Sequence, residues 1–329
     1  MANTGLRMSS DELTETRTAP DGRSVPQRSV RPMRRRRFVK TLTPYLFVLP
    51  AVLFLALLLV YPIVLNIQMS FQDRKLGNLI DGPTPWVGLA NYRAAFRLPA
   101  FSAAAWHSVV FTVSAVTIQF VFGLLLALFF FQNFRGARTM RALFLVAYAI
   151  PIVVSAEVFR WLLDGRGLVN TLLHDLHLQS SPTYWLSDLR LALPALIVVE
   201  IWLGLPFTMV NLMAGLATVP RELYEAASID GANAWSRFWH VTWPLIRPTA
   251  AAAIVLSLIF CFKTFDLVWI ATQGGPGTAS ELLPTLAYRT AFIGFDFGVA
   301  AAILNIVFAV CFVLALAYIV SLRREEAVG

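Results

Sequence analysis

Six long apolar runs, separated by shorter polar stretches, make up the pattern of this chain. A helix that crosses a bilayer needs about 20 apolar residues, and each run is long enough. The runs predict spans at residues 41–72, 108–134, 142–163, 191–217, 250–272 and 298–322. We therefore expect an all-α polytopic membrane protein, with a disordered basic arm (1–40), a six-span domain (41–322) and a short tail (323–329).

The polar stretch 220–249, between the fourth and fifth runs, carries helix signals of its own. Pro220 and Glu222 are typical of a helix start, and Gly231 is typical of a helix end that needs positive φ. Asn233 can cap a second helix. Three aromatic residues of that helix share one face, which suits a membrane interface: Trp235, Phe238 and Trp239. The stretch is either a docking surface for another protein or a re-entrant loop without a partner.

Composition agrees with a membrane protein. Of 329 residues, 57% are hydrophobic and 14% are charged, against about 25% charged in soluble proteins. The net charge of +8 does not indicate nucleic-acid binding, because ten of the 27 basic residues lie before Thr41. The run Arg34–Arg37, with Lys40, borders the first span and predicts contact with anionic lipid on the cytoplasmic side.

The distribution of Lys and Arg predicts the orientation. With the N-terminus inside, the inside segments carry 18 of these residues and the outside segments carry seven. Without the long arm the inside segments still carry eight, in much shorter loops. The positive-inside rule therefore predicts that both termini and the stretch 220–249 lie in the cytoplasm.

The sequence lacks the signatures of an enzyme. No P-loop is present, since none of the three lysines follows a glycine, and no nucleophile elbow, zinc signature or dinucleotide fingerprint occurs. Cys261 and Cys311 lie inside apolar runs, as small core residues do. We expect no catalytic residue, metal or cofactor in this chain, so that ATP and Mg²⁺ would be bound by another subunit.

Polar residues inside the predicted spans are candidates for a substrate pathway, because charge in hydrocarbon is costly. Lys263 and Asp266 are three apart and either neutralise each other on one helix face or contact substrate. Glu200 faces a cavity, is protonated, or pairs with another helix. The neutral amides either bind sugar hydroxyls or pack between helices. The full candidate set is Gln119, Glu200, Asn211, Lys263, Asp266 and Asn305.

The segment EAASIDG, residues 225–231, with Val241 and Trp243-Pro244 after it, resembles the EAA loop of binding-protein-dependent ABC importer permeases. Trp243 stands where that family usually has Leu. In the family this loop forms a coupling helix that docks on a cytoplasmic ATPase. The resemblance implies these docking residues: Glu222, Glu225, Ala226, Ala227, Ile229, Asp230, Gly231 and Ala232.

Other segments resemble the carbohydrate branch of the same family, which includes the maltose, lactose and glycerol-3-phosphate importers. They are WVGLANYRAAF at 86–96, GLVNTLL at 167–173, and the region 262–302 with its GGP and FG motifs. The similarity covers roughly residues 45–320.

This resemblance implies a permease subunit of the bacterial inner membrane that works by alternating access. Its expected partners are two ATPase subunits, a second homologous permease and an extracytoplasmic sugar-binding protein. Two alternatives stay open. One is a secondary transporter with Glu200 or Asp266 as its proton site. The other is an intramembrane scaffold, or an enzyme whose site is unrecognised.

Overall fold

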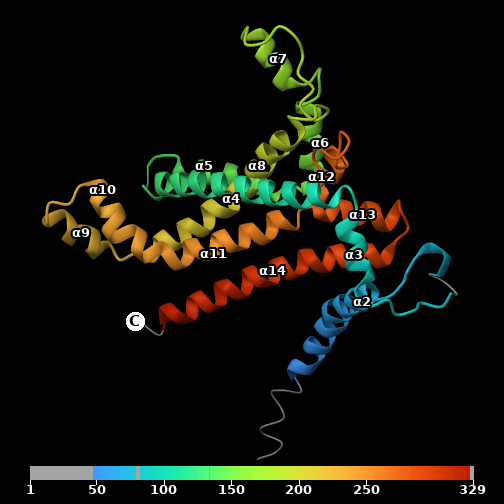
Figure 1. Ribbon diagram of the computed structural model, residues 1–329. Coiled ribbons are helices and arrows are strands. Elements are labelled where there is room, and N and C mark those ends of the chain that lie inside the picture. Colours follow the sequence, from blue (N-terminus) through green and yellow to red (C-terminus); the bar gives the residue numbers. More distant parts are fainter. Residues whose placement is uncertain (1–46, 79–81, 133, 327–329) are drawn as a thin grey trace, which may run out of the picture. The chain divides into compact units, whose positions relative to one another are not determined.

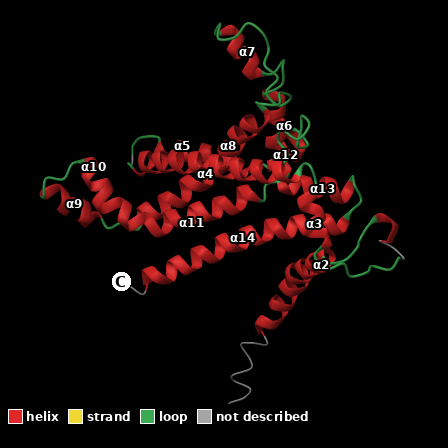
Figure 2. Ribbon diagram, viewed as in Figure 1, coloured by secondary structure: helices red, strands yellow, loops and turns green. Residues whose placement is uncertain are grey.

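The structure, a computed structural model, describes residues 47–78, 82–132 and 134–326. Within these residues it is helical, with two isolated β-bridges and no longer strand (Figure 2). The chain divides into two units, residues 1–60 and 61–329. The predicted basic arm, residues 1–40, and its lipid contact lie outside the described residues.

In the first unit, the described residues are helical and end in a π-helical segment, Ala56–Val60. The second unit holds the helices labelled in Figure 1. Their bounds are α2 (Tyr61–Ser70), α3 (Ala90–Arg97), α4 (Phe101–Phe131), α5 (Ala137–Ala149), α6 (Ile152–Leu162), α7 (Leu168–Asp175), α8 (Ala192–Ala217), α9 (Arg221–Ile229), α10 (Ala234–Arg237), α11 (Trp243–Phe262), α12 (Asp266–Ala271), α13 (Leu283–Phe292) and α14 (Phe297–Glu326).

Five described helices are long and apolar enough to cross a membrane. They agree with five of the six predicted spans and are Phe47–Ser70, Phe101–Phe131, Ala192–Ala217, Ala234–Ala271 and Phe297–Val320. The prediction for residues 142–163 needs a correction, because α5 and α6 meet there at a 96° bend. Pro151 explains it: proline lacks an N–H and pushes Ile150 out of helical geometry, to ψ 130°.

Several helix ends differ from the predicted span ends. Helix α4 begins at Phe101, before the predicted start of the second span at residue 108, and α3 lies between the first two predicted spans. Helix α14 continues to Glu326, beyond the predicted limit at 322. Arg and Glu are good helix formers. The polar residues at the end of α14 therefore continue the helix after the apolar run has stopped.

Helices α4, α8 and α11 lie side by side and form the central packing of the second unit (Figure 1). Small residues lie at these contacts: Ala115 and Ala127 on α4, and Ala253 on α11, are fully buried. Small side chains let helix backbones approach closely, which is how helices pack in membranes.

A polar junction joins α2, α3 and α14. Asn66 Nδ2 donates to Asn305 Oδ1 at 2.6 Å, and Asn305 Nδ2 donates to the Tyr92 hydroxyl at 3.3 Å. The Tyr92 hydroxyl also lies 2.9 Å from Ser70 Oγ. The two amides therefore satisfy each other between helices, as interhelical polar residues do in membrane bundles.

Candidate functional site

The EAA segment, residues 218–249, begins with helix α9. This helix ends in a Schellman motif: the N–H of Ala232 bonds to the Ala227 carbonyl at 2.9 Å, and that of Gly231 bonds to the Ser228 carbonyl at 3.1 Å. Gly231 has φ +80°, which strains any residue with a Cβ. Asn233 then caps α10 by accepting from Ser236 N at 2.8 Å. The predicted helix, glycine turn and second helix are confirmed.

No residue of α9 is buried. Ile229, the most apolar residue at its tip, is 86% exposed. The acidic residues Glu222, Glu225 and Asp230 are exposed as well. A short helix that presents a large aliphatic side chain, small alanines and three carboxylates offers a surface for another protein.

The other side of α9 is fixed to the spans. The Tyr224 hydroxyl lies 3.0 Å from Thr242 Oγ1, and Arg237 Nη1 donates to Ser228 Oγ at 2.8 Å. These bonds tie α9 to α10 and to the π-helical segment Phe238–Thr242, which continues into α11. The three aromatic residues predicted to share one face contact one another: Trp235 contacts Phe238 and Trp239, and Phe238 contacts Trp239. Trp239 also contacts Trp243.

A cavity of about 160 Å³ lies among the spans and is called the midspan cavity below. Its polar lining comes from three helices: Gln119 on α4, Glu200 on α8, and Ser257 and Cys261 on α11. Its aromatic lining is Tyr148, Phe207 and Phe260. The cavity is smaller than most ligand pockets, which enclose roughly 300–1,000 Å³. A larger ligand would therefore require the surrounding helices to move apart.

Glu200 is the most unusual group of this cavity. It is 7% exposed, and Cys261 Sγ approaches its Oε1 at 3.3 Å. Its Oε2 has no hydrogen-bond partner among the described residues. Gln119 Nε2 does not pair with this carboxyl but donates to the Glu200 main-chain carbonyl at 2.8 Å. One carboxyl oxygen is therefore left for a ligand or a water molecule.

The other predicted pathway residues do not line this cavity. Asn211 Nδ2 donates to Phe207 O at 2.8 Å within its own helix, and Asn305 belongs to the junction of α2, α3 and α14. The predicted pairing of Lys263 with Asp266 is wrong, because the helix breaks between them and the described ion pairs do not include it. Lys263 Nζ instead lies 5.1 Å from the Phe260 ring centroid. Among the described residues, no His, Cys, Asp or Glu cluster could hold a metal ion.

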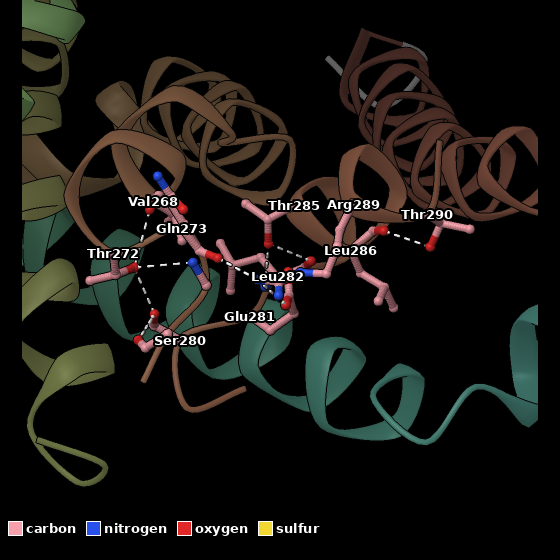
Figure 3. Close-up of polar contacts among 12 residues, drawn as sticks. Val268, Thr272, Gln273, Ser280, Glu281, Leu282, Thr285, Leu286, Arg289 and Thr290 are labelled. Carbon is pink, nitrogen blue, oxygen red and sulfur yellow. Dashed lines mark hydrogen bonds and ion pairs between the residues drawn. The ribbon is translucent and has the colours of Figure 1, made fainter. Parts of the chain in front are cut away.

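The connection from α12 to α13 holds a polar network that sequence reasoning missed (Figure 3). Arg289 Nη2 lies 3.1 Å from Glu281 Oε2 and also donates to the Gln273 carbonyl. The Glu281 side chain is 1% exposed. Burial raises the pKa of Glu281, while Thr285, Arg289 and His107 act in the opposite direction. The sequence signal for this network is the pair Glu281 and Arg289, an acidic and a basic residue eight positions apart that follow the GGP motif.

Helix α8 relates these regions to one another. It has 26 residues, which corresponds to about 39 Å. The EAA segment follows its C-terminal end, the midspan cavity flanks its middle, and the connection before Ala192 lies at its other end. The chain thus carries, at one end of a membrane-length helix, an exposed surface suited to binding another protein. A polar cavity lies halfway along the same helix.

Residues 119–325 match the family model described as "Binding-protein-dependent transport system inner membrane component". The chain is 33% identical over 290 residues to a probable ABC transporter permease protein of Brucella suis, covering 86% of this chain and 98% of that protein. It is 34% identical over 289 residues to the diacetylchitobiose uptake system permease protein DasB of Streptomyces coelicolor, covering 87% of this chain and 88% of that protein. The fold is similar to a chain of a bacterial ABC transporter that imports the acidic polysaccharide alginate, with a TM-score of 0.76, 23% identity, and 88% and 99% of the two chains covered.

Proposed function

Because the chain belongs to the binding-protein-dependent transport family of inner-membrane components, we propose that it is the pore-forming permease subunit of an ATP-driven sugar importer. It is a multi-pass inner-membrane protein, and in this family the ATPase is a separate subunit. One observation carries the proposal: the exposed helix α9 is joined through α10 and α11 to the polar midspan cavity.

The midspan cavity supports a transport role. It combines hydrogen-bonding groups with aromatic walls, a combination that suits the hydroxyls and the C–H faces of a sugar. It is small in this structure, so substrate passage requires α4, α8 and α11 to separate. In alternating access such a cavity opens to one side at a time. The relative DasB is named for uptake of a disaccharide, which supports sugar as the substrate class.

The exposed surface of α9 supports an ATPase as one partner, and the family supports the others. Two ATPase subunits would serve the importer, one of them docking on the EAA segment through Glu222, Glu225, Ala226, Ala227, Ile229, Asp230, Gly231 and Ala232. A second homologous permease would complete the pore, and a sugar-binding protein would dock on the opposite side. A solved relative of the fold was crystallised with its alginate-bound periplasmic protein. ATP and Mg²⁺ would be bound by the ATPase, and this chain would perform no covalent chemistry.

Affinity purification of the tagged full-length protein in mild detergent tests this function. The expected result is co-purification of a P-loop ATPase, a second permease and a sugar-binding protein. A matched pair of variants localises the docking: Glu225→Lys should lose the ATPase and uptake, whereas Asp175→Lys, a charge reversal on α7, should keep both. Transport by the chain alone after reconstitution would contradict the proposal.

A further inference from the structure

A second cavity, of about 370 Å³, lies at the end of the spans opposite the EAA segment and is called the outer cleft. Its walls are the end of α6, the connection before α8, and the end of α12 with the start of the GGP loop. Helix α8 begins at Ala192, just after this connection, and leads to the EAA segment at its other end. The outer cleft is therefore separate from the midspan cavity, with which it shares no lining residue.

Tyr184 provides an aromatic surface in the outer cleft. The residue is 63% exposed. One edge of its ring rests on Gly165, where an added Cβ would approach Tyr184 Cε1 to 2.8 Å. Glycine at 165 thus allows a close contact with one edge of the ring while most of the residue stays accessible. An accessible tyrosine supplies an amphipathic contact area.

The polar groups of the outer cleft combine donors and acceptors. Arg160 only donates, Asp164 only accepts, and Gln273 and Ser187 do both. Arg160 is held in place, since its Nη1 lies 3.1 Å from Glu157 Oε1 and 3.5 Å from the Ile270 carbonyl. Because Glu157 offsets the charge of Arg160, the cleft is not a dedicated anion site.

Gln273 also lines the outer cleft, on the wall formed by the end of α12 and the start of the GGP loop. Its main chain is fixed, because its N–H bonds to Val268 O at 2.9 Å and its carbonyl accepts from Arg289 (Figure 3). Its side-chain amide makes no hydrogen bond to the described residues. A neutral ligand rich in hydroxyls, with an apolar C–H face for Tyr184, matches this set of groups.

We propose that the outer cleft is a second saccharide-binding site, which holds a neutral sugar before it enters the midspan cavity. The proposal rests on the proposed function, because the sugar must be the transported one. It differs from a docking groove for a protein loop, which would use the same walls but would not discriminate between a sugar and an unrelated solute.

Saturation-transfer NMR on the full-length protein tests the proposal, in nanodiscs with the second permease and the ATPase but without the sugar-binding protein. The probes are N,N′-diacetylchitobiose and maltose, with glycerol as the non-sugar reference. Tyr184→Ala should weaken binding of the recognised disaccharide about tenfold, and Gln273→Ala should weaken it less. Leu189→Ala is the control: this residue is 71% exposed in the same connection and does not line the cleft.

The outcomes separate the two proposals. Undiminished sugar binding by both cleft variants would overturn the outer site, even if cells still take up the sugar. Weaker capture of the sugar-binding protein with unchanged sugar affinity would also overturn it and assign the cleft to protein docking. Absence of both sugar binding and sugar uptake in the unmutated protein would contradict the proposed function itself.

Discussion

The side chain of Asn91 lies directly against Gly298. A Cβ on Gly298 would approach Asn91 Nδ2 and the Gln72 carbonyl oxygen to 2.7 Å each. The same Nδ2 donates to the carbonyls of Ser70 and Gln72, both at 2.9 Å. The VGLANY and FG segments, far apart in the sequence, therefore form one contact that joins the end of α2 to the start of α14.

Gly298→Ala should destabilise the protein, because the added methyl group meets a backbone carbonyl that cannot move away cheaply. Overpacking of this kind costs about 1–3 kcal/mol. We expect a lower melting temperature in detergent. Gly77→Ala is the matched control, since a Cβ there meets nothing within 4 Å. Asn91→Ala should be destabilising as well, because the carbonyls of Ser70 and Gln72 lose their shared donor.

Two variants of Gly231 should distinguish insertion of the protein into the membrane from its coupling to the ATPase. Asn tolerates the left-handed region, so Gly231→Asn should keep sugar uptake close to normal. Gly231→Pro forces negative φ and removes the N–H that bonds to Ser228, so it should abolish uptake and ATPase co-purification. Both proteins should reach the membrane in normal amounts. Equal uptake by the two variants would show that this turn has no role in coupling.

Glu200→Leu should impair transport without unfolding the protein. Glu200 Oε2 has no hydrogen-bond partner among the described residues, and burying an unpaired polar group costs free energy, so an apolar residue of similar size should be tolerated there. A lost hydrogen bond to sugar, in contrast, should lower uptake about tenfold or more. Asn211→Leu is the control, because Asn211 bonds within its own helix. Transport assays and melting temperatures are measured on the same preparations. Uptake that falls only in parallel with stability would assign Glu200 a structural role.

Glu281 should make stability depend on pH. Burial is the larger effect and raises its folded-state pKa above the ordinary value of 4.5. The protonated Glu281 carboxyl therefore contributes to the free energy of unfolding in full below the unfolded-state pKa. This contribution is lost as pH rises through the folded-state pKa. Compared with Glu281→Gln, the unmutated protein should lose melting temperature as pH rises from about 4 to about 8. Parallel pH curves for the two proteins would argue against this.

The EAA segment was predictable in detail because its determinants are local. Pro220 and Glu222 lie at the start of α9, Gly231 with its positive φ follows the end of that helix, and Asn233 caps α10. The apolar runs likewise marked five of the spanning helices, because bilayer thickness sets their length. Local signals and the bilayer constraint therefore predict the main elements without reference to tertiary contacts.

What the sequence could not reveal depends on contacts between distant residues. Hydropathy cannot distinguish a straight span from the bent pair at Pro151, since both are apolar. Spacing suggested that Lys263 and Asp266 share a helix face, but the helix stops at the intervening residues. The sequence allows three environments for Glu200, and the packing of α8 against α11 places Cys261 beside it.

The helical path from Ala234 to Phe262 has a mechanical consequence. This path of α10, π-helical segment and α11 begins three residues after the glycine turn and reaches Cys261, which contacts Glu200. A displacement at the glycine turn can therefore reach the midspan cavity along one continuous helical path, without crossing a loop. The helix ends at Phe262 and resumes only at Asp266, so this continuous helical path stops beside the midspan cavity and does not extend into α12.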